Sequence, residues 1–256
     1  MLIDTHSHLY FKHFNSDADE VLSRAVGAGV ERQILIGCSV AESDRAIAFC
    51  RNHKDFDLYC SIGVHPHDAK ELNDNILRKF EMMVDEEDKI VAIGEIGLDY
   101  FRNLSPREMQ MDAFEKQLHL AKKLNLPVII HERDAWEDTI AILGRVGNEK
   151  VVFHSFTGDG VRALDCMERG YHVSFSGMVT YPKNFHMREA VKKAWANRYF
   201  VETDCPYLPP QVFRGQRNEP SFVVETAKEV ARVRGESFEE VASQSTSNAI
   251  MFFGLN

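Results

Sequence analysis

Cysteine is scarce in this 256-residue sequence, and its spacing fits neither a disulfide scaffold nor a Cys-x-x-Cys metal or redox site. The chain has an odd number of cysteines, namely Cys38, Cys50, Cys60, Cys166 and Cys205. Small secreted domains that depend on disulfides carry even numbers of cysteines at regular spacing. The pattern therefore argues against a disulfide framework and favours a reducing compartment.

Long apolar runs and a secretory signal are also missing. No apolar stretch approaches the roughly 18 residues that a membrane span needs. The first residues include Asp4 and His6, where a signal peptide would carry basic residues and then an apolar run. We therefore expect a soluble, cytoplasmic protein without a membrane partner, and nothing in the sequence requires an obligate protein partner.

Positive charge is in deficit. The chain has 30 lysines and arginines against 39 aspartates and glutamates, which gives a formal net charge of -9. Such a surface argues against a protein that coats nucleic acid through bulk charge. It does not exclude an enzyme that draws the end of one strand into a metal site, because metal ions supply positive charge locally.

Short apolar segments alternate with amphipathic ones along the whole chain. The first strand runs from Leu2 into His6-x-His8, and a helix follows Ser16. The other predicted strands are 30–37, 58–64, 89–94, 127–130, 151–153, 171–175 and 199–202. The other predicted helices are 41–53, 72–84, 105–124, 136–146, 161–169, 187–195, 221–234 and 238–252. Eight such units favour an α/β fold of the (β/α)₈ TIM-barrel type as one domain over residues 1–256. The alternative is an open doubly wound sheet.

Two helix starts carry capping signals. Ser16 is a plausible N-cap, because acidic residues follow it in what would be the first turn. Ser105-Pro-Arg-Glu108 has the composition of a capping box, with serine at the N-cap, proline at N1 and glutamate at N3. We expect both serines to bond the backbone of the helix that follows.

Histidines and carboxylates follow the predicted strands repeatedly. The residues at the strand ends are His6, His8, His65, His67, Glu95, His131, His154 and Asp204. A single histidine in such a place is more often an ordinary hydrogen-bonded residue than a ligand. In a barrel, however, all C-terminal strand ends meet at one end, where catalytic groups gather. The recurrence predicts a shared site.

The four histidines that follow strands 1, 5 and 6, together with Glu95 and Asp204, exceed the needs of one tetrahedral ion. We predict two divalent metal ions bridged by Glu95, which lies between the early and late ligands. His6 and His8 would hold one ion with Asp204 nearby, and His131 and His154 would hold the other. Mixed nitrogen and oxygen ligands suit Zn, Mn, Ni or Co, and Mg prefers oxygen-rich sites. Ligand type alone does not select among these five metals.

Seven motifs spread over nearly the whole chain resemble those of the TatD family of metal-dependent hydrolases, and they occur in the family's order. They are IDTHSHL (3–9), GVHPH (63–67), IGEIGLDY (93–100), PVIIHERDA (127–135), FHSFTG (153–158), ETDCPYL (202–208) and RNEP (217–220). The resemblance implies an amidohydrolase-like (β/α)₈ barrel with divalent-metal nuclease activity, often 3′→5′ exonuclease action on single-stranded DNA. By position it implies the ligands His6, His8, Glu95, His131, His154 and Asp204.

A mechanism follows for a phosphodiester substrate, single-stranded DNA or RNA. The metal pair would lower the pKa of a water, and Asp204 would take or orient its proton. His65, Arg133 and Arg217 are candidates to hold phosphates, although either arginine could instead pair with Asp134 or Glu219. Glu202 would share a face with Asp204, as a further ligand or as a supporting partner.

Aromatic residues that follow strand ends are candidates for contact with bases. Tyr100, Phe101 and Tyr207 could stack on bases or pack over the barrel.

Two other functions remain open on sequence alone. The same site could hydrolyse an ester or amide, such as the aminoacyl ester on a D-aminoacyl-tRNA. Many amide-cleaving relatives bridge their metals with a carboxylated lysine, whereas this chain has Glu95, which favours phosphoesters. A non-catalytic metal-dependent binding protein is the third interpretation, and the complete ligand set argues against it.

Overall fold

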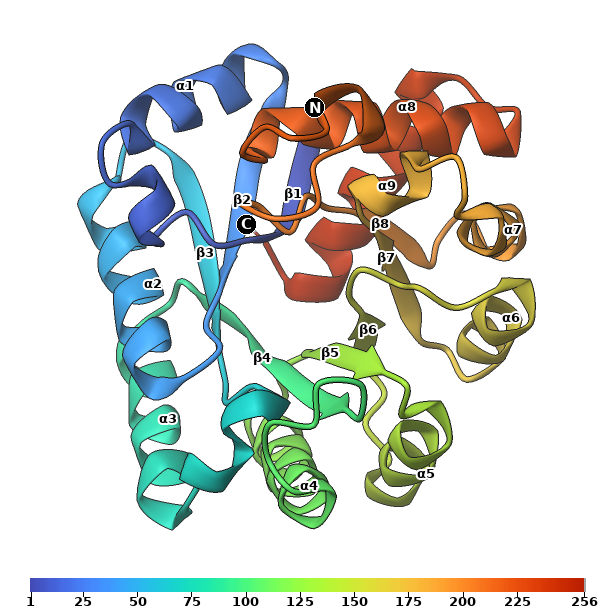
Figure 1. Cartoon of the computed structure of the whole chain (residues 1–256). Coiled ribbons are helices and arrows are strands. Elements are labelled where there is room, and N and C mark those ends of the chain that lie inside the picture. Colours follow the sequence, from blue (N-terminus) through green and yellow to red (C-terminus); the bar gives the residue numbers. More distant parts are fainter. Residues whose placement is uncertain (256) are drawn as a thin grey trace.

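Residues 1–255 are described by a computed structural model, in which eight parallel strands follow one another in sequence order around one sheet. Figure 1 shows the strands in the middle of the molecule and the helices arranged around them. The strands are β1 (Leu2–Ser7), β2 (Val30–Ile36), β3 (Asp57–Ile62), β4 (Ile90–Asp99), β5 (Val128–Arg133), β6 (Val151–Phe153), β7 (His172–Phe175) and β8 (Tyr199–Val201). The consecutive order is that of a (β/α)₈ barrel.

The sheet closes on itself where β1 meets the segment after β8. Ser7 and Cys205 form a parallel bridge, and the His8 amide donates to the Cys205 carbonyl at 2.9 Å. The Asp204 amide donates to the His6 carbonyl, also at 2.9 Å. These bonds confirm the predicted barrel, because an open doubly wound sheet would leave its two edge strands apart.

Nine helices of the described residues connect and cover the strands. They are α1 (Ala18–Gly27), α2 (Val40–Asn52), α3 (Asp74–Glu86), α4 (Arg107–Leu124), α5 (Trp136–Val146), α6 (Gly160–Glu168), α7 (Phe185–Lys193), α8 (Val223–Arg234) and α9 (Phe238–Phe253). Helices α1 to α8 surround the barrel, with their apolar faces toward the strands (Figure 1). No helix within residues 1–255 has the length and apolar character needed to cross a membrane.

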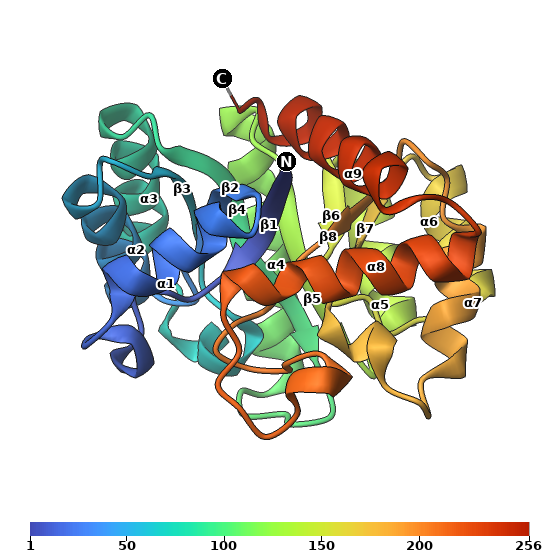
Figure 2. The same cartoon turned by 90° about the horizontal axis from the view of Figure 1, so that it is seen from above.

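Helix α9 has a different position from the others. Figure 2 shows it lying across one end of the barrel, on the side opposite the long loop that precedes α4. Its C-terminal part packs against apolar side chains that point into the barrel. This inner cluster consists of Ile3, Ile34, Ile36, Tyr59, Val91, Ala92, Ile129, Val152, Phe200, Ala249, Phe252, Phe253 and Leu255. The N-terminal end of the barrel is therefore closed by apolar packing.

Strands β4 and β5 extend further than predicted. The sequence pattern placed Glu95 and His131 just beyond their strands, but β4 continues to Asp99 and β5 to Arg133. Parallel pairing continues there, with Gly97 opposite His131. Gly97 has φ +141°, and a Cβ atom on it would lie 2.0 Å from the His131 carbonyl oxygen. Glycine is therefore required for the close approach that brings these two strands together.

Both predicted serine caps are wrong. Helix α1 begins at Ala18, and its N-terminal flanking residue is Asp17 rather than Ser16. Helix α4 begins at Arg107, and the Ser105 hydroxyl donates to the His67 carbonyl at 2.7 Å instead of capping the helix. At Ser105 a bond to a distant segment thus replaces the expected local cap.

Candidate metal centre

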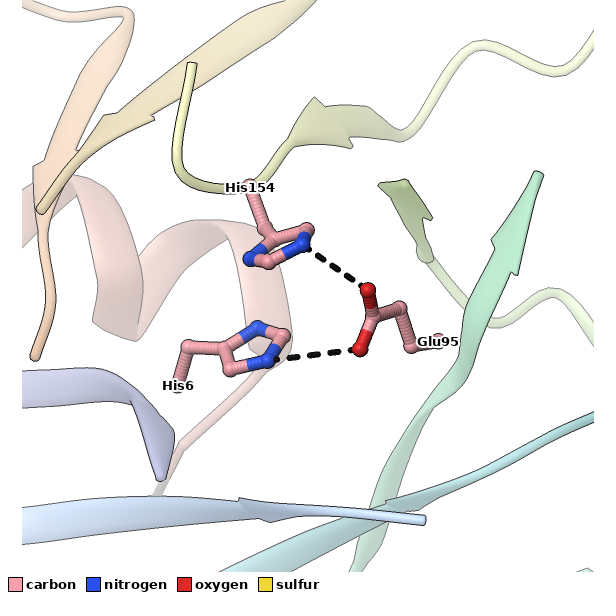
Figure 3. A group of neighbouring side chains, drawn as sticks. All are labelled: His6, Glu95 and His154. Carbon is pink, nitrogen blue, oxygen red and sulfur yellow. Dashed lines mark ion pairs between the residues drawn. The ribbon is translucent and has the colours of Figure 1, made fainter. Parts of the chain in front are cut away.

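Glu95 lies in the middle of a group of histidines at the C-terminal end of the barrel. It is 4% exposed, and its Oε1 atom is 2.7 Å from His131 Nδ1, 2.9 Å from His154 Nε2 and 3.4 Å from His65 Nε2. Its Oε2 atom faces His6 Nε2 at 3.5 Å. Figure 3 shows the carboxylate directing one oxygen toward His154 and the other toward His6. The carboxylate therefore faces histidines on two sides.

Asp204 and the first two histidines form an adjoining group. Asp204 Oδ1 lies 3.7 Å from His6 Nε2 and 3.5 Å from His8 Nε2. The ring of His8 is held by the contact of its Nδ1 with the Ile36 carbonyl at 3.2 Å. Asp204 has a left-handed backbone, with φ +59°, and its amide is held by His6. A strained non-glycine residue of this kind is characteristic of functional sites.

The donor atoms fall into small groups in which all members lie within 4.8 Å of one another. The groups are His6–Glu95–His154, His6–His8–Asp204, His8–Cys38–Glu95 and His65–Glu95–His131. All six ligands predicted from the sequence occur in these groups. The structure thus brings together residues that are up to about two hundred positions apart in the chain.

His6 provides a test of whether metal ions fit this site. The residue is completely buried, and neither ring nitrogen forms a hydrogen bond within the described residues. Leaving a buried polar atom without a partner costs roughly 1–3 kcal/mol. A bound cation would satisfy Nε2, which faces Glu95 and Asp204, and imidazole with carboxylate is a ligand set that divalent metals accept. The residues present therefore fit metal binding.

The electrostatics of the site keep its carboxylates ionised. Burial alone would raise the pKa of Glu95, but His154, His65 and His131 hold it well below its usual value. Burial would likewise raise the pKa of Asp204, and the bond from His8 with the nearby His6 and His154 lowers it. Two buried anions are therefore available to cations at neutral pH.

Asp99 is a site residue that the sequence prediction missed. It is 1% exposed, and its Oδ2 lies 2.8 Å from His67 Nε2 and 3.2 Å from His131 Nε2. Glu95 and Asp99 lie on one strand at an even spacing, so both can project toward the same face. The signal was present in the Gly-Leu-Asp that follows Glu95, but it requires the longer strand to be recognised.

Glu202 lies beneath the centre and supports it. The side chain is 1% exposed, and its Oε1 is 3.3 Å from His154 Nδ1 and accepts from the Ser155 amide at 2.7 Å. A carboxylate on the second nitrogen of a ligating histidine fixes the ring's orientation and tautomer. These contacts agree with the supporting role toward a histidine ligand that the sequence suggested for Glu202.

The predicted phosphate contacts differ in placement. His65 lies beside Glu95, within the centre. The guanidinium of Arg133 lies 4.0 Å from the ring centroid of Phe101, which is 60% exposed. Arg217 instead forms an ion pair with Asp17 at 2.6 Å, outside the metal centre.

The expected alternative partner of the arginines, Glu219, is bonded by Arg24 at 2.7 Å. The structure thus brings His65 to the centre and engages Arg217 elsewhere.

The three aromatic residues predicted to contact bases also differ in their exposure. The hydroxyl of Tyr100 donates to Asp138 at 2.7 Å, and Arg107 covers its ring at 4.2 Å. Tyr207 is 50% exposed, and its amide donates to the Asp204 carbonyl at 3.0 Å. Phe101 and Tyr207 therefore have free surface for a ligand, whereas Tyr100 is engaged in packing.

Sequence comparisons relate the chain to metal-dependent hydrolases. Residues 3–254 match the sequence profile of the family described as TatD related DNase. The chain is 42% identical over 258 residues to YabD, an uncharacterized metal-dependent hydrolase of Bacillus subtilis, with 100% of both chains covered. It is 36% identical over 261 residues to the 3'-5' ssDNA/RNA exonuclease TatD of Pantoea ananatis, covering 99% of this chain and all of that one.

Solved structures show the same barrel. The crystal structure of YJJV, a TatD homolog from Escherichia coli, superposes with a TM-score of 0.93 at 31% identity, covering 100% of this chain and 98% of that one. The phosphotriesterase homology protein from Escherichia coli superposes with a TM-score of 0.71 at 15% identity over 98% of each chain. The second likeness concerns the fold alone.

Proposed function

Because the chain belongs to the TatD family of metal-dependent hydrolases, we propose that it is a 3′→5′ exonuclease that hydrolyses phosphodiester bonds of single-stranded DNA, with RNA as a second substrate. Relatives about 36% identical over their whole length are named 3'-5' ssDNA/RNA exonucleases. The observation that carries the proposal is the position of Glu95, whose two carboxylate oxygens face different histidines, His6 and His154.

Two divalent ions fit this arrangement. Glu95 would bridge them, with His6, His8 and Asp204 toward one ion and with His131 and His154 toward the other. When bound, the metals supply Lewis acidity that lowers the pKa of a water and neutralises charge on a phosphoryl oxygen. The candidates are Mg, Mn, Zn, Ni and Co, and the histidines favour the transition metals.

The side chains around this centre provide the remaining functions. Asp204 is ionised, so it can accept the proton of the attacking water at its carboxylate. His65 faces Glu95 and can donate to a phosphate oxygen, and Arg133 offers a charged group at the end of β5. The exposed rings of Phe101 and Tyr207 offer stacking surfaces for unpaired bases. Stacking requires bases that are not paired, which supports a single-stranded substrate.

The test is hydrolysis of labelled oligonucleotides by the purified protein. Single-stranded DNA and RNA labelled at the 5′ end would be incubated with Mg²⁺, Mn²⁺, Zn²⁺ or EDTA. We expect a metal-dependent ladder that shortens from the 3′ end. Asp204→Asn should reduce the rate by about 10²–10⁴-fold, because a general base is lost. Asp44→Asn is the matched control, since Asp44 is exposed on α2 and pairs with Lys79.

The opposite outcome is equally clear. If the protein binds metal but cleaves neither DNA nor RNA with any of these ions, the nuclease proposal is wrong. Release of the amino acid from an aminoacyl-tRNA under the same conditions would then identify ester hydrolysis as the activity. A ladder of equal strength in Asp204→Asn would remove Asp204 from the proposed role.

A further inference from the structure

The thiol of Cys38 lies among potential metal ligands, and no other cysteine of the described residues belongs to such a group. Cys38 follows the end of β2 by two positions, and it is half-buried, whereas Cys50, Cys60, Cys166 and Cys205 are buried. Its Sγ atom lies 3.6 Å from Glu95 Oε2. The Glu95 amide donates to the Gly37 carbonyl at 3.0 Å, so the backbone keeps these two residues together.

The Cys38 thiol lies close to two residues that the sequence predicted as metal ligands. Donor atoms of His8, Cys38 and Glu95 all lie within 4.8 Å of one another. An independent observation points to a ligand at the same place. The Nε2 atom of His6, which is completely buried and without a hydrogen bond in the described residues, lies 3.5 Å from the same Glu95 Oε2. A nitrogen and a sulfur therefore converge on one carboxylate oxygen: the Cys38 thiol donates to it, and His6 Nε2 lies near it without forming a hydrogen bond.

We propose that Cys38 is an additional ligand of the ion held by the His6–His8–Asp204 side of the centre. On binding, the S–H bond breaks, a sulfur–metal bond forms, and the proton passes to solvent, with no change of oxidation state. Thiolate is a soft ligand that suits zinc and cobalt, whereas magnesium prefers oxygen. Cys38 thereby shifts the selectivity of this ion site from magnesium toward zinc or cobalt.

This inference rests on the metal dependence of the proposed function and deepens it. Neither the ligand set implied by the sequence motifs nor the pairing of Glu95 with histidines includes a thiol. A sulfur ligand makes a prediction that nitrogen and oxygen ligands do not make, because thiolate-bound cobalt absorbs strongly in the near ultraviolet through charge transfer. The prediction can therefore be tested without measuring catalysis.

The experiment compares cobalt-loaded protein with its Cys38→Ser and Cys38→Ala variants. We expect an intense near-ultraviolet charge-transfer band in the parent protein and its loss in both variants, with the weaker visible bands of bound cobalt retained. Cys166→Ala is the matched control and should keep the band, because Cys166 is buried on α6. Zinc affinity, measured by competition with a chelator, should fall at least about tenfold in the Cys38 variants, and magnesium affinity should stay within about twofold.

The outcomes separate this proposal from the proposed function. A parent protein that binds cobalt without the charge-transfer band overturns the role of Cys38, whether or not it cleaves DNA. A band that persists in both Cys38 variants does the same. Conversely, the band could be present in a protein that cleaves no nucleic acid, and then only the nuclease proposal would fail. Because Cys38 is replaced in two different ways, poor folding of one variant does not prevent a result.

Discussion

The same strands carry buried polar and charged residues at one end of the barrel and an apolar core at the other. At the C-terminal end, buried charges and imidazoles surround Glu95, and the nitrogens of His6 have no hydrogen-bond partner in the described residues. At the N-terminal end, α9 covers the barrel, and Phe200 packs against Phe252 and Phe253. One end therefore gathers ionisable groups around the unpartnered ring of His6, and the other is closed by apolar packing. Barrels of this type separate activity from stability in this way.

Two histidines show the contrast within one residue type. His154, at the C-terminal end, is buried, but Glu95 and Glu202 raise its pKa well above the ordinary value. His172, at the start of β7, stacks on Phe200 with ring centroids 5.1 Å apart. Burial and nearby Arg198 lower its pKa to about 3. Carboxylates thus make one histidine favour charge, and apolar neighbours make the other favour neutrality.

The largest expected effect comes from removing the charge at the C-terminal end. Glu95→Gln keeps the shape of the side chain but removes the negative charge that is proposed to bridge the two metals. We expect hydrolysis to fall by about 10⁴-fold, because metals contribute several kcal/mol of transition-state stabilisation. The near-ultraviolet circular dichroism, which reports the packing of aromatic side chains such as Phe200, Phe252 and Phe253, should persist. Glu137→Gln, at the exposed start of α5, should keep full activity. Full activity in Glu95→Gln would end the distinction between the two ends.

A second prediction concerns the N-terminal end. Phe200 is completely buried, so Phe200→Ala leaves a cavity and should lower the free energy of unfolding by about 3–5 kcal/mol. The rate per folded molecule should remain within about twofold. Urea unfolding and initial rates on the same preparation provide the measurement. Phe185→Ala, at a side chain that is 70% exposed, is the control and should cost less than about 0.5 kcal/mol. A rate that falls with stability in Phe200→Ala would show that the ends are coupled.

The smallest effect is the pH dependence that His172 contributes. The unfolded chain binds a proton here below about pH 6.5, whereas the folded barrel excludes it until about pH 3. Above pH 6.5, His172 therefore does not lower the free energy of unfolding. As the pH falls from 6.5 to 3, the unfolded state gains a proton that the folded state excludes, and the free energy of unfolding falls by about 1.4 kcal/mol per pH unit. Between pH 7 and pH 5, His172→Gln should lose about 2 kcal/mol less than the parent in urea unfolding. Equal losses in both proteins would refute this assignment.

The sequence predicted the central residues of the candidate site better than the residues that surround them. Histidines and carboxylates that follow one apolar strand after another rarely coincide by chance. The structure brings the six residues predicted as ligands into neighbouring groups that could hold metal ions. Asp99 was missed because the length of β4 depends on its pairing with β5, which Gly97 permits and which no local propensity reports. Cys38 entered the sequence analysis only as one of five cysteines that indicate no disulfide framework, since its proximity to Glu95 arises from the arrangement of neighbouring strands.

At the other end, the pattern predicted the last helix but not its position. The sequence indicates that 238–252 is helical, and the structure shows α9 at Phe238–Phe253. Its apolar face could equally have joined the outer ring, because amphipathicity does not name the surface that a helix covers. The serine caps failed for a related reason: Ser105 bonds the distant His67 carbonyl, a tertiary contact that local sequence does not encode.

The seam between β1 and the segment after β8 also has a consequence for biosynthesis. Asp4 accepts hydrogen bonds from Thr203, 199 residues later in the chain. A ribosome adding about 5–20 residues per second needs roughly 10–40 s to pass from the first ligands to the last. A nascent chain that lacks the eighth strand has His6 and His8 without Asp204. Such a fragment cannot complete the centre, so incomplete translation products are expected to lack the hydrolytic activity of the finished protein.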